Sequence, residues 1–74
     1  MAQVPLVRPE VVIKTFEGFG WAVARQRGSH IIMTKSGEMV TLSIPNHAQV
    51  ARGTLRRLIQ LAGLTVEEFV GEED

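Results

Sequence analysis

The sequence predicts a small α+β domain in which a helix, three strands and a second helix follow one another. Three observations predict this order: an apolar stripe at helical spacing near the start, three short β-rich segments separated by glycine turns, and a second helical stripe towards the end. We expect a three-stranded antiparallel sheet with both helices on one face and the other face open to solvent. The 74 residues form a single domain, 1–74, in which residues 1–7 and 71–74 are expected to be flexible.

The first helix is expected to begin at Pro9, because proline suits the first helical position, where its missing N–H is not needed. Val12, Phe16 and Phe19 recur at spacings of four and three residues and mark one apolar face. Gly20 is expected just beyond the end of this helix, since glycine readily adopts the left-handed conformation found there.

The three predicted strands span residues 21–27, 30–34 and 39–44, with Gly28-Ser29 and Ser36-Gly37 as the turns between them. These tight connections predict an antiparallel meander. Because successive side chains of a strand point to opposite faces, the first strand is expected to place on one face Trp21, Val23, Arg25 and Arg27. The same alternation directs inward, from the third strand, Val40, Leu42 and Ile44.

The second helix carries the strongest helical pattern of the chain, in which four apolar residues recur at i, i+3, i+4 and i+7: Leu55, Leu58, Ile59 and Ala62. Gly63 is expected just beyond its end. Thr65 and Glu68 then match the capping-box pattern, which predicts a short third helical turn that returns Phe69 to the core. The predicted order matches the architecture of double-stranded-RNA-binding domains, and a fold by itself assigns no function.

The net charge of zero conceals a strong asymmetry along the chain. Residues 1–66 contain all eight lysines and arginines and only three acidic residues, which gives them a formal charge of +5. The last eight residues contain five acidic side chains and no basic one, a formal charge of −5. A basic body suits binding to a polyanion, or to a partner protein that imitates one. The alternative is a solubilising acidic tail with scattered surface charge.

Composition and patterning argue against several classes of protein. The chain has no cysteine, which removes disulfides and thiolate metal sites and fits a reducing, cytoplasmic setting. The longest apolar runs are only a few residues, so no membrane span is expected, and the start lacks the pattern of a secretory signal peptide. No metal site or cofactor is expected, because the two histidines are seventeen residues apart and neither has an acidic residue at ligand spacing.

The most informative stretch is Gly28-Ser29-His30, which places a histidine directly after a glycine turn, with Arg25 and Arg27 just upstream. Histidine is the side chain whose usual pKa, about 6.5, lets it both accept and donate a proton near neutral pH. Beside guanidinium groups that neutralise phosphate charge, an imidazole is suited to cleaving a phosphodiester bond. His30 is therefore the candidate catalytic residue, with Arg25, Arg27 and Lys35 near enough to bind phosphate. The alternative is an ordinary surface histidine at the start of a strand.

Three other features admit both a functional and a structural interpretation. His47 could supply a second proton-transfer group, or it could hydrogen-bond the backbone where the chain leaves the sheet, which is the role we favour. The first amides of the helix that opens at Gly53-Thr54 could hold a phosphate, or simply begin the helix. Trp21 could stack on a base, or anchor the first strand to the first helix. With no tyrosine and three phenylalanines, a broad stacking surface is not expected.

Six short motifs occur in an order and spacing that resemble one protein family. They are Gly20-Trp21, Arg25-Gln26-Arg27-Gly28-Ser29-His30, Ile44-Pro45-Asn46-His47, Gly53-Thr54-Leu55-Arg56, Ala62-Gly63-Leu64 and Glu67-Glu68-Phe69. Each motif alone is weak. Together they resemble the HicA (YcfA-like) family of toxins over about residues 8–70, which is nearly the whole chain.

The resemblance implies a small ribonuclease of a toxin–antitoxin pair with the double-stranded-RNA-binding fold. Such proteins cleave mRNA without a metal and depend on the histidine of the Gly-Ser-His motif, which is His30 here. A HicB-type antitoxin that covers the active site holds them inactive. We expect RNA contacts from Arg25, Arg27, Gly28, Ser29 and Lys35. One departure is Ile31, where many relatives have a second histidine or an aromatic residue, and this change could lower activity or alter RNA preference.

Two other classes of protein stay open. A non-catalytic RNA-binding module of the same fold, with His30 as a surface residue, predicts salt-sensitive RNA binding that survives His30→Ala and no cleavage products. A protein-interaction domain that meets its partner with the sheet face predicts no RNA affinity at physiological salt.

Overall fold

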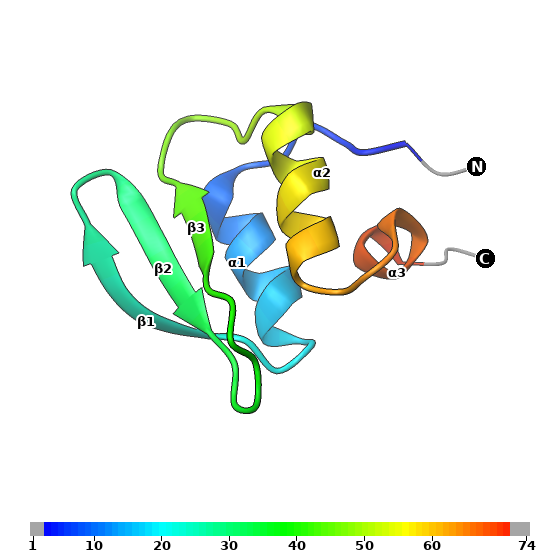
Figure 1. Ribbon diagram of the computed structural model, residues 1–74. Helices are drawn as coiled ribbons and strands as arrows, with labels where there is room; N and C mark the ends of the chain where they lie inside the picture. The colour runs from blue at the N-terminus through cyan, green and yellow to red at the C-terminus, as the bar shows by residue number, and fades with distance from the viewer. Residues whose placement is uncertain (1–2, 72–74) are drawn as a thin grey trace.

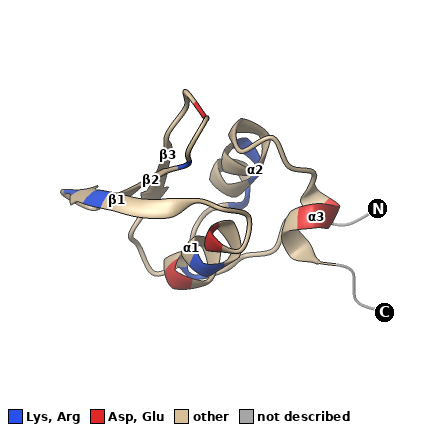
Figure 2. Cartoon of the chain, turned by 90° about the horizontal axis from the view of Figure 1, so that it is seen from below, with Lys and Arg blue, Asp and Glu red and all other residues tan. Residues whose placement is uncertain are grey.

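The computed structural model describes residues 3–71 and confirms the predicted α+β order (Figure 1). The elements are helix α1 (Pro9–Glu17), strands β1 (Ala22–Arg27), β2 (His30–Thr34) and β3 (Leu42–Pro45), helix α2 (Arg52–Leu61) and the short helix α3 (Val66–Val70). The strands form one antiparallel sheet in the order β1-β2-β3. Helix α1 packs against β1 and β3, and α2 packs against β3 (Figures 1 and 2).

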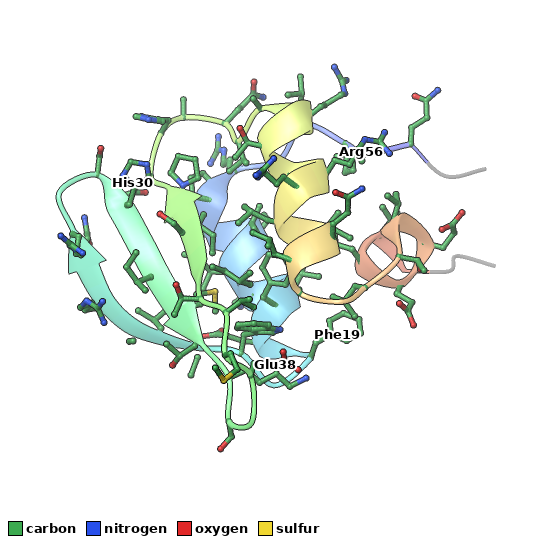
Figure 3. All side chains as sticks on the ribbon, in the orientation of Figure 1. Phe19, His30, Glu38 and Arg56 are labelled. Atoms are coloured by element: carbon green, nitrogen blue, oxygen red, sulfur yellow. The ribbon has the colours of Figure 1, made fainter. Side chains whose placement is uncertain are left out.

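Helix α1 begins at Pro9, as the sequence predicts, and ends at Glu17, before the expected Phe19. Pro9 is its first residue, and Val12 and Phe16 are fully buried on the face that meets the sheet. Gly20 has a φ of 100°, in the left-handed region that glycine adopts without steric cost. Phe19 lies just beyond the helix rather than on it, and is half-buried against the core (Figure 3).

The predicted alternation along the first strand is wrong, because a β-bulge interrupts β1 between Val23 and Arg25. Val23 pairs with Met33, which is fully buried in the core. Arg25 pairs with Ile32, the neighbour of Met33 in β2, whose side chain points to the opposite face. A bulge inserts one extra residue and so shifts the alternation by one position. Val23 and Arg25 therefore lie on opposite faces of the sheet.

The third strand is shorter than predicted. Leu42 and Ile44 are fully buried, as the alternation indicates, but Val40 is 37% exposed and Met39 is 96% exposed. Pairing with β2 begins only at Leu42, so residues 35–41 form a loop that projects from the sheet (Figure 1). An alternating pattern shows which way side chains would point, and does not show how far a neighbouring strand continues to pair.

One hydrophobic core joins the sheet to all three helices. From α2 it receives, as predicted, Leu55, Leu58 and Ile59. The predicted capping box is present: the Thr65 hydroxyl oxygen accepts a hydrogen bond from the Glu68 N–H at 3.0 Å, and the Thr65 N–H donates to Glu68 Oε1 at 2.8 Å. Phe69 is 6% exposed and its ring centroid lies 5.0 Å from that of Phe16, which confirms that α3 returns it to the core.

The described part of the N-terminal segment packs on the body of the protein, although its sequence shows no period. Val4 is 2% exposed, and its carbonyl oxygen accepts a hydrogen bond from Arg52 Nε at 3.0 Å. The Val50 N–H donates to the Val7 carbonyl at 2.8 Å. The expected flexibility of residues 1–7 and 71–74 stays a prediction, and residues 1–2 and 72–74 lie outside the described residues.

Candidate active site

The strand register places His30 and Arg27 side by side on the open face of the sheet. His30 pairs with Arg27 on one side and with Pro45 on the other. Met33, three positions along β2, points into the core, so His30 points to the opposite face. Directly paired residues hold their Cβ atoms about 4.5–5.5 Å apart. Both residues are exposed and line one hollow, so the imidazole and the guanidinium can reach one ligand; His30 is labelled in Figure 3.

A hollow of about 330 Å³ opens beside His30 and is lined by Arg27, His30, Ile32 and Ser43. Ile32 is only 8% exposed and supplies an apolar surface within it. The other three side chains supply a proton acceptor, a cation and a hydroxyl. This is the set of groups that a phosphodiester with its ribose would need around it for proton transfer and charge neutralisation.

The turn before His30 is anchored on both sides. Gly28 has a φ of 57°, the left-handed conformation, and a Cβ built on it would meet no atom within 4 Å. Its carbonyl oxygen accepts a hydrogen bond from Gln26 Nε2 at 3.1 Å. The Ser29 carbonyl accepts one from the Asn46 N–H at 2.7 Å. His30 is therefore held at the start of a paired strand rather than at a free loop tip.

The structure places the other two predicted phosphate-binding residues differently. Arg25 pairs with Ile32 and so lies on the same face as His30, about 7 Å further along the sheet. Lys35 follows the end of β2, roughly 17 Å along the strand from His30. Its side chain packs at Gly20, where a built Cβ would lie 3.1 Å from Lys35 Cε. The prediction that Lys35 lies near His30 is wrong. The two residues are five positions apart in sequence, and an extended chain of that length places them far apart in space.

His47 lies apart from the hollow that contains His30. It lines a separate polar hollow of about 430 Å³ together with Arg8, Glu10, Ala48 and Gln49. The two hollows have no residue in common. Within residues 3–71, the His47 side chain also forms no hydrogen bond to the backbone. Neither of the two interpretations of His47 is supported by this geometry.

Trp21 anchors β1 to α1. It is 2% exposed, belongs to the core, and its backbone N–H donates to the Phe16 carbonyl at 3.1 Å. The anchoring role predicted for Trp21 is confirmed. A buried ring cannot stack on a base, so the alternative role is wrong.

A groove between β3 and α2 was not predicted from the sequence. It has a volume of about 220 Å³ and is lined by Thr41, Ser43, Thr54, Arg57, Leu58 and Leu61. Ser43 lines both this groove and the His30 hollow, so the two depressions meet. The outward position of Ser43 follows from the alternation in β3. Its proximity to Arg57 depends on how α2 packs beside β3 (Figure 1).

Charge is distributed unevenly over the elements (Figure 2). Basic residues lie on β1 and α2, α1 carries both signs of charge, and α3 has acidic residues in its first turn and no basic residue in its last. Helix α2 contains three arginines and no acidic residue. Arg27 of β1 lines the His30 hollow and Arg57 of α2 lines the adjoining groove, so each of the two depressions contains a basic side chain.

Two further observations concern ligands and membranes. Within residues 3–71, no group of three histidine, aspartate or glutamate side chains is placed to hold a metal ion. None of the helices in that range has the length and hydrophobicity that a bilayer span requires.

The fold and the site define a small α+β domain of the double-stranded-RNA-binding type, with a histidine and two arginines on its open sheet face. A model of the family described as the HicA toxin of bacterial toxin–antitoxin systems matches residues 10–64. The chain therefore belongs to the HicA toxin family, as the sequence motifs predict. A search of curated proteins found no match.

Proposed function

We propose that this chain is a toxin endoribonuclease that cleaves mRNA without a metal, with His30 as general base and acid. The observation that carries the proposal is the pairing of an exposed His30 with Arg27 in one hollow on the open sheet face. Membership of the HicA toxin family supports the toxin role. The basic surface of β1 and α2 supports a polyanionic substrate.

In this proposal Arg27 binds the phosphate at which cleavage occurs, and Arg25 binds the backbone further along the sheet. Gly28 and Ser29 connect Arg27 to His30, which both line the hollow, and both are exposed, so they can contact the ribose-phosphate chain. Three of the four residues that line the hollow are exposed, so a single strand can lie across it. The substrate is therefore mRNA in a single-stranded region, where the backbone can adopt the geometry that cleavage needs.

The reaction needs only one proton-transfer group. His30 removes the proton from a ribose 2′-OH, and the resulting oxygen attacks the adjacent phosphorus. The bond from phosphorus to the 5′-oxygen breaks, and the imidazolium returns the proton to that oxygen. The products are a 2′,3′-cyclic phosphate and a 5′-OH, with no net change in protons on the enzyme. DNA lacks the 2′-OH, so it binds and is not cut.

The same sheet face would also bind the protein partner of the toxin. A HicB-type antitoxin would inhibit the toxin by covering the face that contains His30 and the arginines. Because the substrate is mRNA, the protein acts in the cytoplasm, and no membrane is involved.

The test is cleavage of an end-labelled RNA in excess EDTA by the parent protein, His30→Ala and His47→Ala. His47→Ala is the matched control, because it removes the other exposed histidine outside the hollow. We expect His30→Ala to slow cleavage by about 10²- to 10⁴-fold, the usual contribution of one acid–base group. The single tryptophan, Trp21, is buried, so its fluorescence shows whether each variant is folded.

Equal cleavage by the parent protein and His30→Ala would contradict the proposal and indicate a contaminant or another catalytic residue. RNA binding by all three proteins without cleavage would favour a non-catalytic RNA-binding module. Cutting of an all-deoxy strand would contradict attack by the 2′-OH.

A further inference from the structure

The His30 hollow continues into the groove between β3 and α2. Ser43 lines both depressions, and it pairs with Ile32, which itself lines the His30 hollow. The path from His30 over Ser43 therefore crosses the open face of β2 and β3 and ends against α2. Figure 3 shows His30 at the start of β2, with β3 and then α2 beside it.

The groove between β3 and α2 is lined by both a cationic and an apolar side chain. Arg57 lines the groove, and α2 has no acidic residue that could neutralise it. Leu61 is 43% exposed and offers an apolar surface beside it. The Thr54 hydroxyl also lines the groove. A guanidinium suits a phosphate, and an apolar side chain suits the face of a base or ribose, so one nucleotide could use both.

We propose that the RNA strand runs from His30 over Ser43 into the groove between β3 and α2, where Arg57 binds the phosphate of a nearby nucleotide. This inference rests on the proposed function, since it extends the same RNA site to a second contact. Arg57 is then a substrate-binding residue, and His30 remains the catalytic one. The groove favours RNA over an acidic protein segment because it is continuous with the hollow in which the cleaved phosphate lies.

Helix α2 supplies a matched control. Arg56 precedes Arg57 and has the same charge, but consecutive helical residues point about 100° apart. Arg56 does not line the groove and projects from the side of α2 that faces away from the sheet (Figure 3). Arg56→Ala and Arg57→Ala remove the same charge from neighbouring exposed positions, so their difference isolates the groove.

The first experiment measures binding rather than cleavage. A fluorescently labelled, uncleavable 2′-O-methyl strand of ten nucleotides is titrated with the parent protein and both variants, by anisotropy at two salt concentrations. We expect Arg57→Ala to weaken binding about tenfold and to lower the salt slope by about 0.7, as loss of one phosphate contact on a single strand does. Arg56→Ala should change the affinity by less than about twofold.

The second experiment measures cleavage of a dinucleotide and of the ten-nucleotide RNA. A dinucleotide has one phosphate, which occupies the His30 hollow and leaves none for Arg57. Arg57→Ala should therefore lower kcat/KM about tenfold for the long RNA and leave dinucleotide cleavage unchanged.

The outcomes separate the two proposals. Equal effects of Arg56→Ala and Arg57→Ala, or no effect of either, would overturn the path through the groove even if the parent protein cleaves RNA. Selective loss of antitoxin affinity in Arg57→Ala, with unchanged RNA binding, would also overturn it and assign the groove to a protein partner. Selective loss of strand binding without any cleavage by the parent protein would support the path while contradicting the proposed nuclease. Absence of RNA binding would overturn both.

Discussion

Two arginines of β1 offer a test of whether cleavage occurs beside His30, as proposed. Arg27 pairs directly with His30, whereas Arg25 pairs with Ile32, two residues further along β2. Both are exposed, both lie on the open face, and they carry the same charge. Arg27→Ala and Arg25→Ala therefore differ in one respect, which is the distance of the lost guanidinium from the phosphate that His30 would act on.

The expected losses in the maximal rate of cleavage differ by about 5- to 50-fold between the two variants. A guanidinium in contact with a phosphate makes charge-assisted hydrogen bonds that contribute about 1.5–3 kcal/mol, which corresponds to a factor of roughly 10–100. At about 10 Å in water, a unit charge interacts with another by only about 0.4 kcal/mol, and salt at physiological strength screens part of this. Arg27→Ala should thus lower the maximal rate of cleavage by about 10- to 100-fold. Arg25→Ala should lower that rate by only about twofold and act chiefly by weakening RNA binding, since Arg25 binds the backbone away from the cleaved phosphate.

The assay is single-turnover cleavage of one end-labelled RNA by saturating protein in excess EDTA, with the two variants compared at equal ionic strength. Arg27→Lys is included because it keeps the charge and loses the planar fork of donors, so it should recover only part of the rate. Urea unfolding followed by Trp21 fluorescence should show midpoints close to that of the parent protein, since exposed substitutions usually change stability little. If Arg25→Ala lowered the maximal rate of cleavage as much as Arg27→Ala, cleavage would not occur beside His30 as proposed.

Three further predictions concern the rest of the chain. Lys35→Ala should leave RNA cleavage within about twofold of the parent rate, because Lys35 follows the end of β2 that is far from His30. A larger loss in the same assay would place the RNA along the whole strand. Phe69→Ala should lower the free energy of unfolding by about 3–4 kcal/mol, measured in urea by Trp21 fluorescence, because it empties a buried contact in the core. A loss below about 1 kcal/mol would mean that α3 contributes little to the folded state. Gly28→Ala should lower the free energy of unfolding by about 1 kcal/mol in the same measurement, since alanine must take the left-handed conformation there. An unchanged unfolding midpoint would show that the turn rearranges.

The features that sequence predicted well are those fixed by near neighbours. The start of α1 at Pro9, the turn at Gly28 and the capping box of Thr65 and Glu68 each depend on contacts within a few residues. The position of His30 at the start of a strand belongs to the same class. Local preferences of this kind depend on the residues themselves, so the sequence alone predicts them.

The features that sequence did not predict depend on partners far along the chain. The bulge between Val23 and Arg25 becomes visible only when β1 is paired with β2. The N-terminal segment is held by Arg52, which follows its bonding partner Val4 by 48 residues. The groove at Arg57 exists because α2 packs beside β3. Each requires the register or the packing of two elements, and a periodic pattern in one element does not contain that information.

The openness of the site determines how a protein partner can control it. A stable protein interface of ordinary size covers about 800 Å² on each partner, which is about a sixth of the 4894 Å² that this chain exposes. An antitoxin interface of that size centred on His30 would extend over Arg27 and Ser43 and reach the groove at Arg57, because these positions are continuous. Inhibition then requires coverage alone, with no change in the shape of the toxin. A saturating 2′-O-methyl strand and the antitoxin should therefore exclude each other in a competition titration. A stable ternary complex of toxin, strand and antitoxin would show that the antitoxin acts from another surface.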